Sequence, residues 1–312
     1  MRLLVFDPGF VFYEPLLRKL VKTPWDIEGE WGDEGWLRRE LRGADALLSA
    51  NFKPEWRGLA RNLKAVFYPG PDLAQTDPSD LPAGCLLSNV FEHAAPIADY
   101  VFYNMLRHVT RIEEHASAFR QGYWSGSARV AGQTHGELCG KTISLLGYGT
   151  IGQQIARRAE AFDMKVLIKR RNHEDPGFWT DCDFLVIACP LTEDTQRIVG
   201  RYQLESLRDG AMLINIACAE IVDESALFAA LSGRKLFAAL DTWYDYPTDI
   251  GQRMHGSRLP FHELPNVVVT PQLSAWTGSM IERRMSAIAA NLDRLALGQP
   301  LERVVLKGTW ST

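Results

Sequence analysis

A glycine-rich turn stands near the middle of the 312-residue chain, in the pattern Gly-x-Gly-x-x-Gly that runs from Gly147 to Gly152. The strand-like segment 141–146 precedes it, and the proline-free, helix-like segment 153–162 follows it. In such a unit the first glycine permits a tight turn, the second lets the backbone approach a pyrophosphate, and the third packs the helix against the strand. The helix amino terminus then offers free N–H groups to the anion. The pattern predicts a dinucleotide site formed by Gly147, Tyr148, Gly149, Thr150, Ile151 and Gly152.

The residues after the second strand of this unit, 164–168, bear on the choice between NAD and NADP. An acidic residue about 20 positions beyond the turn would hold the ribose 2′-hydroxyl of NAD. The chain has Lys169, Arg170 and Arg171 there instead. Because a guanidinium matches the geometry of a phosphate, these cations predict that NADP(H) is preferred, with NAD(H) still possible. The alternative is an ordinary solvated basic turn.

Short apolar runs alternate with stretches of helical spacing along the whole chain. Alternation of this kind is typical of parallel sheets built from right-handed crossovers, so we expect an α/β architecture. The runs predicted to be strands are 3–6, 46–48, 65–68, 86–90, 143–146, 166–168, 184–188, 212–216, 237–240 and 267–269.

The length of the chain exceeds what one hydrophobic core usually supports, so two domains are expected. A linking helix is predicted over 95–111 and a last helix that stops at Gly298, after which the apolar run 304–306 folds back onto the first domain. We therefore expect a substrate domain from 1–95 and 285–312, and a dinucleotide-binding domain from 96–284. The segment 122–140, rich in Gly, Ser and Gln, is predicted to be a loop or arm that embraces a second subunit.

Composition excludes several classes of protein. The formal net charge of −4 is too small to attract a polyanion, so no nucleic-acid partner is expected. No apolar run approaches the roughly 18 residues of a membrane span, and the first run is too short for a signal peptide. The five cysteines are odd in number and scattered without a C-x-x-C pair, which favours neither a zinc site nor disulfides. We expect a cytoplasmic protein with no metal.

From about residue 111 onward the sequence resembles the D-isomer-specific 2-hydroxy acid dehydrogenases, which include glyoxylate/hydroxypyruvate reductases, phosphoglycerate dehydrogenases and formate dehydrogenases. The resemblance implies a Rossmann-type dinucleotide-binding domain inserted in a smaller flavodoxin-like substrate domain, an active site between them, and a homodimer that pairs through the nucleotide domain. It also implies that Pro190, Thr195, Ala217 and Asp241 contact the cofactor. The matching segments are 147–152, 190–192 with Thr195, 213–217, 221–224 with Leu227, 240–241, 264–266 and 270–271, with weaker matches at 70–72, Asn89 and 98–99.

The same resemblance implies that three catalytic residues of the family are replaced. In the family an arginine holds the substrate carboxylate, a histidine transfers the proton and a glutamate raises the basicity of that histidine. The matching positions here are Cys218, Gln272 and Tyr246. A thiol cannot form a bidentate contact with a carboxylate, and an amide cannot give up a proton near neutral pH.

Two side chains, one of them at a replaced position, are candidates for the missing proton donor. Tyr246 can donate through its phenol, provided that its pKa is lowered from about 10. His93, where the first domain leads into the linking helix, is the second candidate, with a purely structural role as its alternative. In the first domain, Pro69 and Pro71 flank Gly70 and remove two backbone donors from a loop that holds the carboxylate in the family.

These features favour an NAD(P)-dependent oxidoreductase of this family, an NADP-preferring dehydrogenase or reductase with a rewritten active site. Its substrate is expected to be an unidentified small carbonyl, hydroxyl or imine compound rather than the usual 2-keto carboxylate. The replacement of all three catalytic residues leaves one alternative open, a catalytically silent NAD(P)-binding sensor or scaffold protein.

Overall fold

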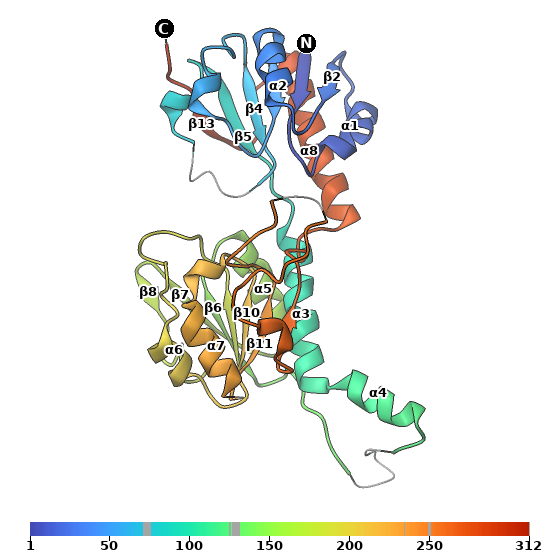
Figure 1. Cartoon of the computed structure of the whole chain (residues 1–312), viewed down its shortest axis with the longest axis vertical. Helices are drawn as coiled ribbons and strands as arrows, with labels where there is room; N and C mark the ends of the chain where they lie inside the picture. Colours follow the sequence, from blue (N-terminus) through green and yellow to red (C-terminus); the bar gives the residue numbers. More distant parts are fainter. Residues whose placement is uncertain (71–75, 125, 127–131, 234, 249–250, 312) are drawn as a thin grey trace. The chain divides into compact units, whose positions relative to one another are not determined.

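The computed structural model describes residues 1–70, 76–124, 126, 132–233, 235–248 and 251–311, so Pro71 lies outside the described residues. The chain forms two compact units (Figure 1): one combines Met1–Glu92 with Gly278–Thr312, and the other is His93–Thr277. The divisions lie a few residues before the expected positions after 95 and 284. Helix α8 (Gly278–Ala296) is one amphipathic element that packs on the first sheet, so it belongs whole to the first unit.

The first unit is built on a six-stranded sheet in the order β13-β5-β4-β3-β1-β2. All neighbours are parallel except the edge strand β13, which runs antiparallel to β5. The order β2-β1-β3-β4-β5 is that of flavodoxin-like folds. The strands are β1 (Arg2–Val5), β2 (Asp26–Gly29), β3 (Ala46–Leu48), β4 (Ala65–Tyr68), β5 (Leu86–Asn89) and β13 (Val304–Lys307).

Helices cover both faces of this first sheet. Strand side chains alternate between two cores, so that Leu3 packs on one face and Leu4 on the other. Helices α1 (Glu14–Leu20) and α8 pack on the face of Leu3, and α2 (Glu34–Glu40) packs on the face of Leu4. Burial on both faces explains why these strands appear in the sequence as continuous apolar runs.

The second unit is built on a seven-stranded sheet in the order β12-β11-β10-β9-β6-β7-β8. Every pair is parallel except β7 with β8. Crossovers leave the central strand β6 in both directions, which is the Rossmann arrangement. The strands are β6 (Thr142–Leu146), β7 (Lys165–Arg170), β8 (His173–Glu174), β9 (Phe184–Ile187), β10 (Met212–Asn215), β11 (Phe237–Leu240) and β12 (Val267–Val269).

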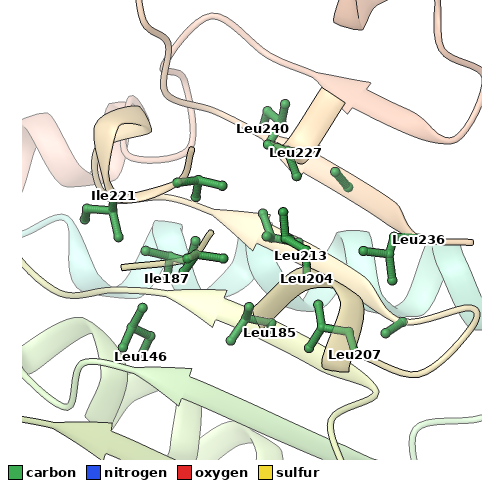
Figure 2. Close-up of a cluster of buried hydrophobic side chains, with 14 of the residues drawn as sticks. Leu146, Leu185, Ile187, Leu204, Leu207, Leu213, Ile221, Leu227, Leu236 and Leu240 are labelled. Atoms are coloured by element: carbon green, nitrogen blue, oxygen red, sulfur yellow. The ribbon is translucent and has the colours of Figure 1, made fainter. Parts of the chain in front are cut away.

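Two hydrophobic cores sandwich the second sheet. Helices α3 (Ala94–Thr110) and α5 (Thr150–Ala161) pack together on one face. On the other face, leucines of α6 (Arg201–Ser206) and α7 (Glu224–Ser232) pack against strand residues such as Leu213 (Figure 2). The predicted α/β fold class is confirmed, because every apolar run predicted as a strand forms one. None of the described helices has the length and apolar character that crossing a membrane would require.

Helix α4 (Ile112–Arg120) extends away from the rest of the second unit (Figure 1). It follows α3 after Arg111, whose left-handed φ of 49° ends the longer helix. No residue of α4 is buried, and Ile112 and Phe119 are 57% and 55% exposed. Most of the segment 122–140 predicted to be an arm follows directly, although residues 125 and 127–131 are not described.

Candidate functional site

The carboxyl ends of the parallel strands in the second unit carry the predicted site residues. Gly147 follows β6, Pro190 lies just beyond β9, Cys218 just beyond β10, Asp241 follows β11, and Gln272 lies just beyond β12. Parallel strands place these ends along one edge of the sheet, where open α/β sheets bind ligands. The topology therefore brings distant segments of the chain to a common edge.

Two glycines of the turn have no room for a side chain. Gly147 has a φ of +105°, and a Cβ there would lie 2.6 Å from the backbone of Ala188. A Cβ on Gly152 would lie 2.5 Å from the carbonyl oxygen of Gly147. Both contacts are far inside van der Waals distance, so the turn can close onto β9 and α5 only with glycine at these positions.

Gly149 is a glycine for a different reason. It is the N-cap residue of α5, its φ of −80° suits any residue, and a Cβ would meet nothing within 4 Å. The open space lies at the amino terminus of the helix, where unpaired N–H groups attract anions. A bare backbone at this position suits close approach of a pyrophosphate, so the turn fits a dinucleotide.

A pocket of about 480 Å³ joins this turn to the other predicted cofactor residues. Thr150 lies at the exposed start of α5, and the side chain of Ile151 packs against the core that α3 and α5 share, so Ile151 can serve a ligand only through its backbone. The predicted cofactor residues that line the pocket are Gly147, Tyr148, Gly149, Lys169, Arg170, Arg171, Pro190 and Thr195.

The three cations of the pocket differ in their partners. Lys169 forms an ion pair with Glu174 across the β7–β8 pair. Arg170 and Arg171 are exposed, and neither forms an ion pair with any residue that the structure describes. Asp175 lies near the end of β7, but its carboxylate accepts a hydrogen bond from Ile168 N at 2.8 Å and contacts His173. The two arginines are therefore the cations available to an anionic ligand.

Side-chain hydrogen bonds fix the turns that carry Thr195 and Ala217. Thr195 Oγ1 donates to the Pro190 carbonyl at 2.7 Å and closes the turn after β9. Asn215 accepts from Ala217 N at 3.1 Å and donates to the Cys218 carbonyl at 3.0 Å, so this buried amide fixes the turn after β10.

Asp241, which is 1% exposed, organises the loop after β12. Its carboxylate accepts hydrogen bonds from Thr270 Oγ1 at 2.6 Å and from the backbone N–H groups of Leu273 and Ser274 at 2.9 Å each. Tyr100 of α3 bonds the same threonine hydroxyl at 2.8 Å. The carboxylate thus holds in place the loop that carries Gln272.

Gln272 adopts a left-handed backbone conformation with a φ of 55°. Residues other than glycine, asparagine, aspartate and histidine rarely adopt this region, and doing so costs about 1–2 kcal/mol. Such conformations persist where the surrounding structure imposes them, here through the bonds to Asp241. The geometry marks Gln272 as a residue held in a specific place.

Gln272 and Tyr246 line a second pocket, of about 380 Å³. Trp243 connects them: its backbone N–H donates to Tyr246 Oη at 3.1 Å, and its indole N–H donates to the Thr270 carbonyl at 2.8 Å. The pocket therefore brings together Gln272 and Tyr246, two of the three positions that the resemblance identified as catalytic. The third, Cys218, lies just beyond β10 and is not among the described residues of this lining.

The two candidate proton donors lie in different surroundings. Burial raises the pKa of Tyr246 above its usual value, so its phenol is a weaker acid, where a donor would need a lowered pKa. His93 is 6% exposed and lies at the N-cap position of α3, a buried place at the start of the unit.

Several residues of the site were not predicted from the sequence. Asn215 and Thr270 belong to the matched motifs, and their motif positions were the only available signal. Trp243 and the histidines His255 and His262, which line the pocket of Tyr246 and Gln272, had no signal at all. Their roles depend on contacts between loops that are distant in sequence.

Comparisons with known proteins agree with this geometry. A family model described as D-isomer specific 2-hydroxyacid dehydrogenase, NAD binding domain, matches residues 102–274. The hydroxypyruvate reductase of Thermotoga maritima is 31% identical over 237 residues, which are 72% of this chain and 74% of that protein.

Solved structures share the whole fold. A 2-hydroxyacid dehydrogenase from Ketogulonicigenium vulgare matches with a TM-score of 0.78 at 23% identity, over 99% of both chains. An acyclic imino acid reductase, solved in complex with NADPH and D-Arg, matches with a TM-score of 0.73 at 22% identity, over 98% of this chain and 100% of that one. At these identities the likeness concerns the fold.

Proposed function

Because the chain belongs to the D-isomer specific 2-hydroxyacid dehydrogenase family, whose NAD-binding domain it carries, we propose that it is an NADP(H)-preferring oxidoreductase acting on a substrate other than a 2-keto carboxylate. The observation that carries this proposal is the lining of the pocket at Tyr246 and Gln272. Among the described residues of that lining there is no lysine or arginine, and Asp245 is the one carboxylate. A carboxylate substrate would have no guanidinium or ammonium partner within this lining.

The cofactor part of the proposal rests on the first pocket. The bare backbone at Gly149 and the amino terminus of α5 would hold the pyrophosphate, and Arg170 and Arg171 would hold the 2′-phosphate. When bound, the nicotinamide supplies hydride chemistry. Thr195 and Asn215 keep the turns after β9 and β10 in place for it.

The substrate part of the proposal favours a neutral carbonyl or a cationic imine over an anion. Asp245 contributes a negative charge to the pocket, and the phenol of Tyr246 is neutral near pH 7. A protonated imine is attracted by such a lining, and a neutral aldehyde or ketone is not repelled by it. A protein of the same fold is named an acyclic imino acid reductase, although an imino acid carries a carboxylate that the substrate proposed here lacks.

One observation favours a second candidate, a catalytically silent NAD(P)-binding sensor or scaffold. None of Cys218, Tyr246 and Gln272 is a good proton donor at neutral pH.

A hydride-transfer screen distinguishes the two functions. We expect NADPH consumption with at least one neutral aldehyde, ketone or cyclic imine. Tight NADPH binding without turnover across aldehydes, ketones, imines and keto acids would instead support the silent protein.

The preference for NADP is tested by Arg170→Asp. A charge-assisted hydrogen bond to a phosphate contributes roughly 1.5–3 kcal/mol, so the Kd for NADPH should rise about 10-fold to 100-fold. The Kd for NADH should change by less than about 3-fold. Isothermal titration of both nucleotides measures this. The control is Lys165→Asp. This substitution changes the charge by the same amount, but at the other end of β7. Equal weakening of NADPH and NADH in the Arg170 variant would refute the 2′-phosphate assignment.

We also propose that two copies pair through the exposed side of α4. Ile112, Phe119 and Trp124 are 57%, 55% and 61% exposed, and Phe119 packs edge-on against Trp124 at 5.3 Å. Exposed apolar clusters of this kind commonly mark contact surfaces. The Phe119→Asp variant should sediment as a monomer at about 10 μM, a concentration that a symmetric dimer of this type normally survives. Tyr202→Asp, at an exposed aromatic on α6, is the control and should remain dimeric. A wild-type monomer would contradict the proposal.

The five free cysteines support a reducing compartment such as the cytoplasm as the location of the protein.

A further inference from the structure

Two histidines lie stacked in the pocket that Tyr246 and Gln272 line. The rings of His255 and His262 have their centroids 3.6 Å apart and their planes within 8° of parallel. Neither residue belongs to a motif that the sequence analysis identified, and the function proposed above makes no use of them.

The backbone beside His255 is fixed by an unusual contact. Gly256 has a φ of +71°, and a Cβ on it would lie 2.5 Å from the ring of Trp243. Its carbonyl accepts two hydrogen bonds, from Tyr244 N at 3.1 Å and from Asp245 N at 2.9 Å. The two ends of the loop that begins at Tyr246 are therefore joined at Gly256, the residue after His255. Gly256 also packs against Trp243, the tryptophan whose backbone N–H donates to Tyr246.

The backbone beside His262 is fixed from the core. His262 is the middle residue of the single turn η6 (Phe261–Glu263), and Phe261 is 1% exposed. The Phe261 ring packs at 90° against Phe228 of α7, with the centroids 5.3 Å apart. Each histidine is thus the sequence neighbour of a residue that the fold holds in place. The fold therefore fixes the two rings in their stacked arrangement.

We propose that the His255–His262 pair supplies the proton for reduction in this pocket, a role that rests on the proposed oxidoreductase function. The substrate carbon accepts a hydride from the dinucleotide, and the electron pair of the C=O or C=N bond moves to the oxygen or nitrogen. A carbonyl oxygen, or the nitrogen of a neutral imine, takes a proton from an imidazolium of the pair, which leaves a neutral imidazole. A protonated imine has already taken that proton before the hydride arrives. Solvent water returns the proton, and the reaction runs backwards by the same transfers.

The chemistry of the surrounding side chains supports this assignment. Histidine is the residue type that exchanges protons near neutral pH, and the two histidines are the only ones among the described residues of the lining. One carboxylate oxygen, Glu263 Oε1, lies 3.8 Å from His262 Nε2, and Asp245 lines the same pocket. Burial raises the pKa of Tyr246, which makes its phenol a weaker acid.

The test uses the full-length protein with NADPH and three probes: 2-methyl-1-pyrroline, benzaldehyde and glyoxylate. The variants His255→Phe and His262→Phe keep a flat ring in the stack and remove the titratable nitrogens. Because a general acid contributes roughly 100-fold to 10,000-fold, we expect kcat with the best probe to fall at least 100-fold in one or both variants. The Kd for NADPH should be unchanged. In His255→Ala and His262→Ala, added imidazole should restore part of the lost rate.

A readout independent of turnover comes from nitrogen-15 NMR of the histidine rings. In the complex with NADP⁺, 2-methyl-1-pyrroline binds without being reduced, and the ring nitrogens of the pair should shift. If wild-type protein reduces a probe and both Phe variants keep that rate, the pair is structural and this proposal is wrong while the proposed function stands. If no probe is reduced and no ring nitrogen shifts, the proposed function fails and this proposal fails with it.

Discussion

Replacing Gly149 with aspartate is expected to abolish dinucleotide binding without weakening the fold. The Cβ would enter open space, and aspartate is a favourable N-cap residue that stabilises a helix by up to about 1 kcal/mol. The same carboxylate would occupy the N–H groups at the start of α5 and repel a pyrophosphate. Like charges in such contact cost several kcal/mol, so the Kd for NADPH should rise at least about 100-fold.

Isothermal titration measures the Kd for NADPH, and thermal unfolding measures the stability of the variant. Gly147→Ala is the matched control within the same turn, since its Cβ would lie 2.6 Å from the backbone of Ala188 at a φ of +105°. That variant should lose roughly 2–5 kcal/mol of unfolding free energy. If Gly149→Asp bound NADPH as tightly as the wild type, the anion would lie elsewhere and the turn would not be its site.

The double variant Cys218→Arg with Gln272→His is expected to create glyoxylate reduction with NADPH. The arginine restores a bidentate partner for a carboxylate at the end of β10, and the histidine restores a general acid in the loop after β12. Histidine is among the residues that tolerate the left-handed conformation of Gln272, so the loop should accept it. We expect kcat/KM for glyoxylate to rise by about 100-fold or more over the wild type.

Single variants separate the two contributions. If the stacked histidines supply the proton, Cys218→Arg alone should gain activity, and Gln272→His should add less than it would in a pocket without a donor. Cys218→Lys is the control, because an ammonium carries the charge without the planar fork. An inactive double variant that still binds NADPH and melts normally would mean that these positions do not correspond to the catalytic positions of the family.

The fold could be predicted from the sequence because its strands are buried on both faces. Continuous apolar runs such as the one that forms β9 (Phe184–Ile187) carry this signal directly. Strands that lack a continuous apolar run were not predicted. In β2 (Asp26–Gly29) only Ile27 is buried, and β8 (His173–Glu174) has two exposed residues, because both lie at sheet edges. The seven-residue helices α1 and α2 were missed since each buries a single leucine.

The candidate site also has one part that could be predicted from the sequence and one part that could not. The glycine turn is a local feature, so its sequence pattern was sufficient to place it. The stacked histidines arise from a loop closed on Trp243 and a turn anchored by Phe261, contacts that no short-range pattern reveals. Asp241 was predicted to contact the cofactor, and its carboxylate accepts three hydrogen bonds from the loop after β12. The sequence did not reveal those bonds.

The most direct test of the central claim follows the hydride itself. NADPH carrying deuterium at C4 is incubated with the protein and a panel of neutral aldehydes, ketones, cyclic imines and glyoxylate, and the products are analysed by mass spectrometry. We predict deuterium at the reduced carbon of a neutral carbonyl or an imine, and none in glycolate. Label in glycolate at a comparable rate, or no label in any product while NADPH remains tightly bound, would contradict the account.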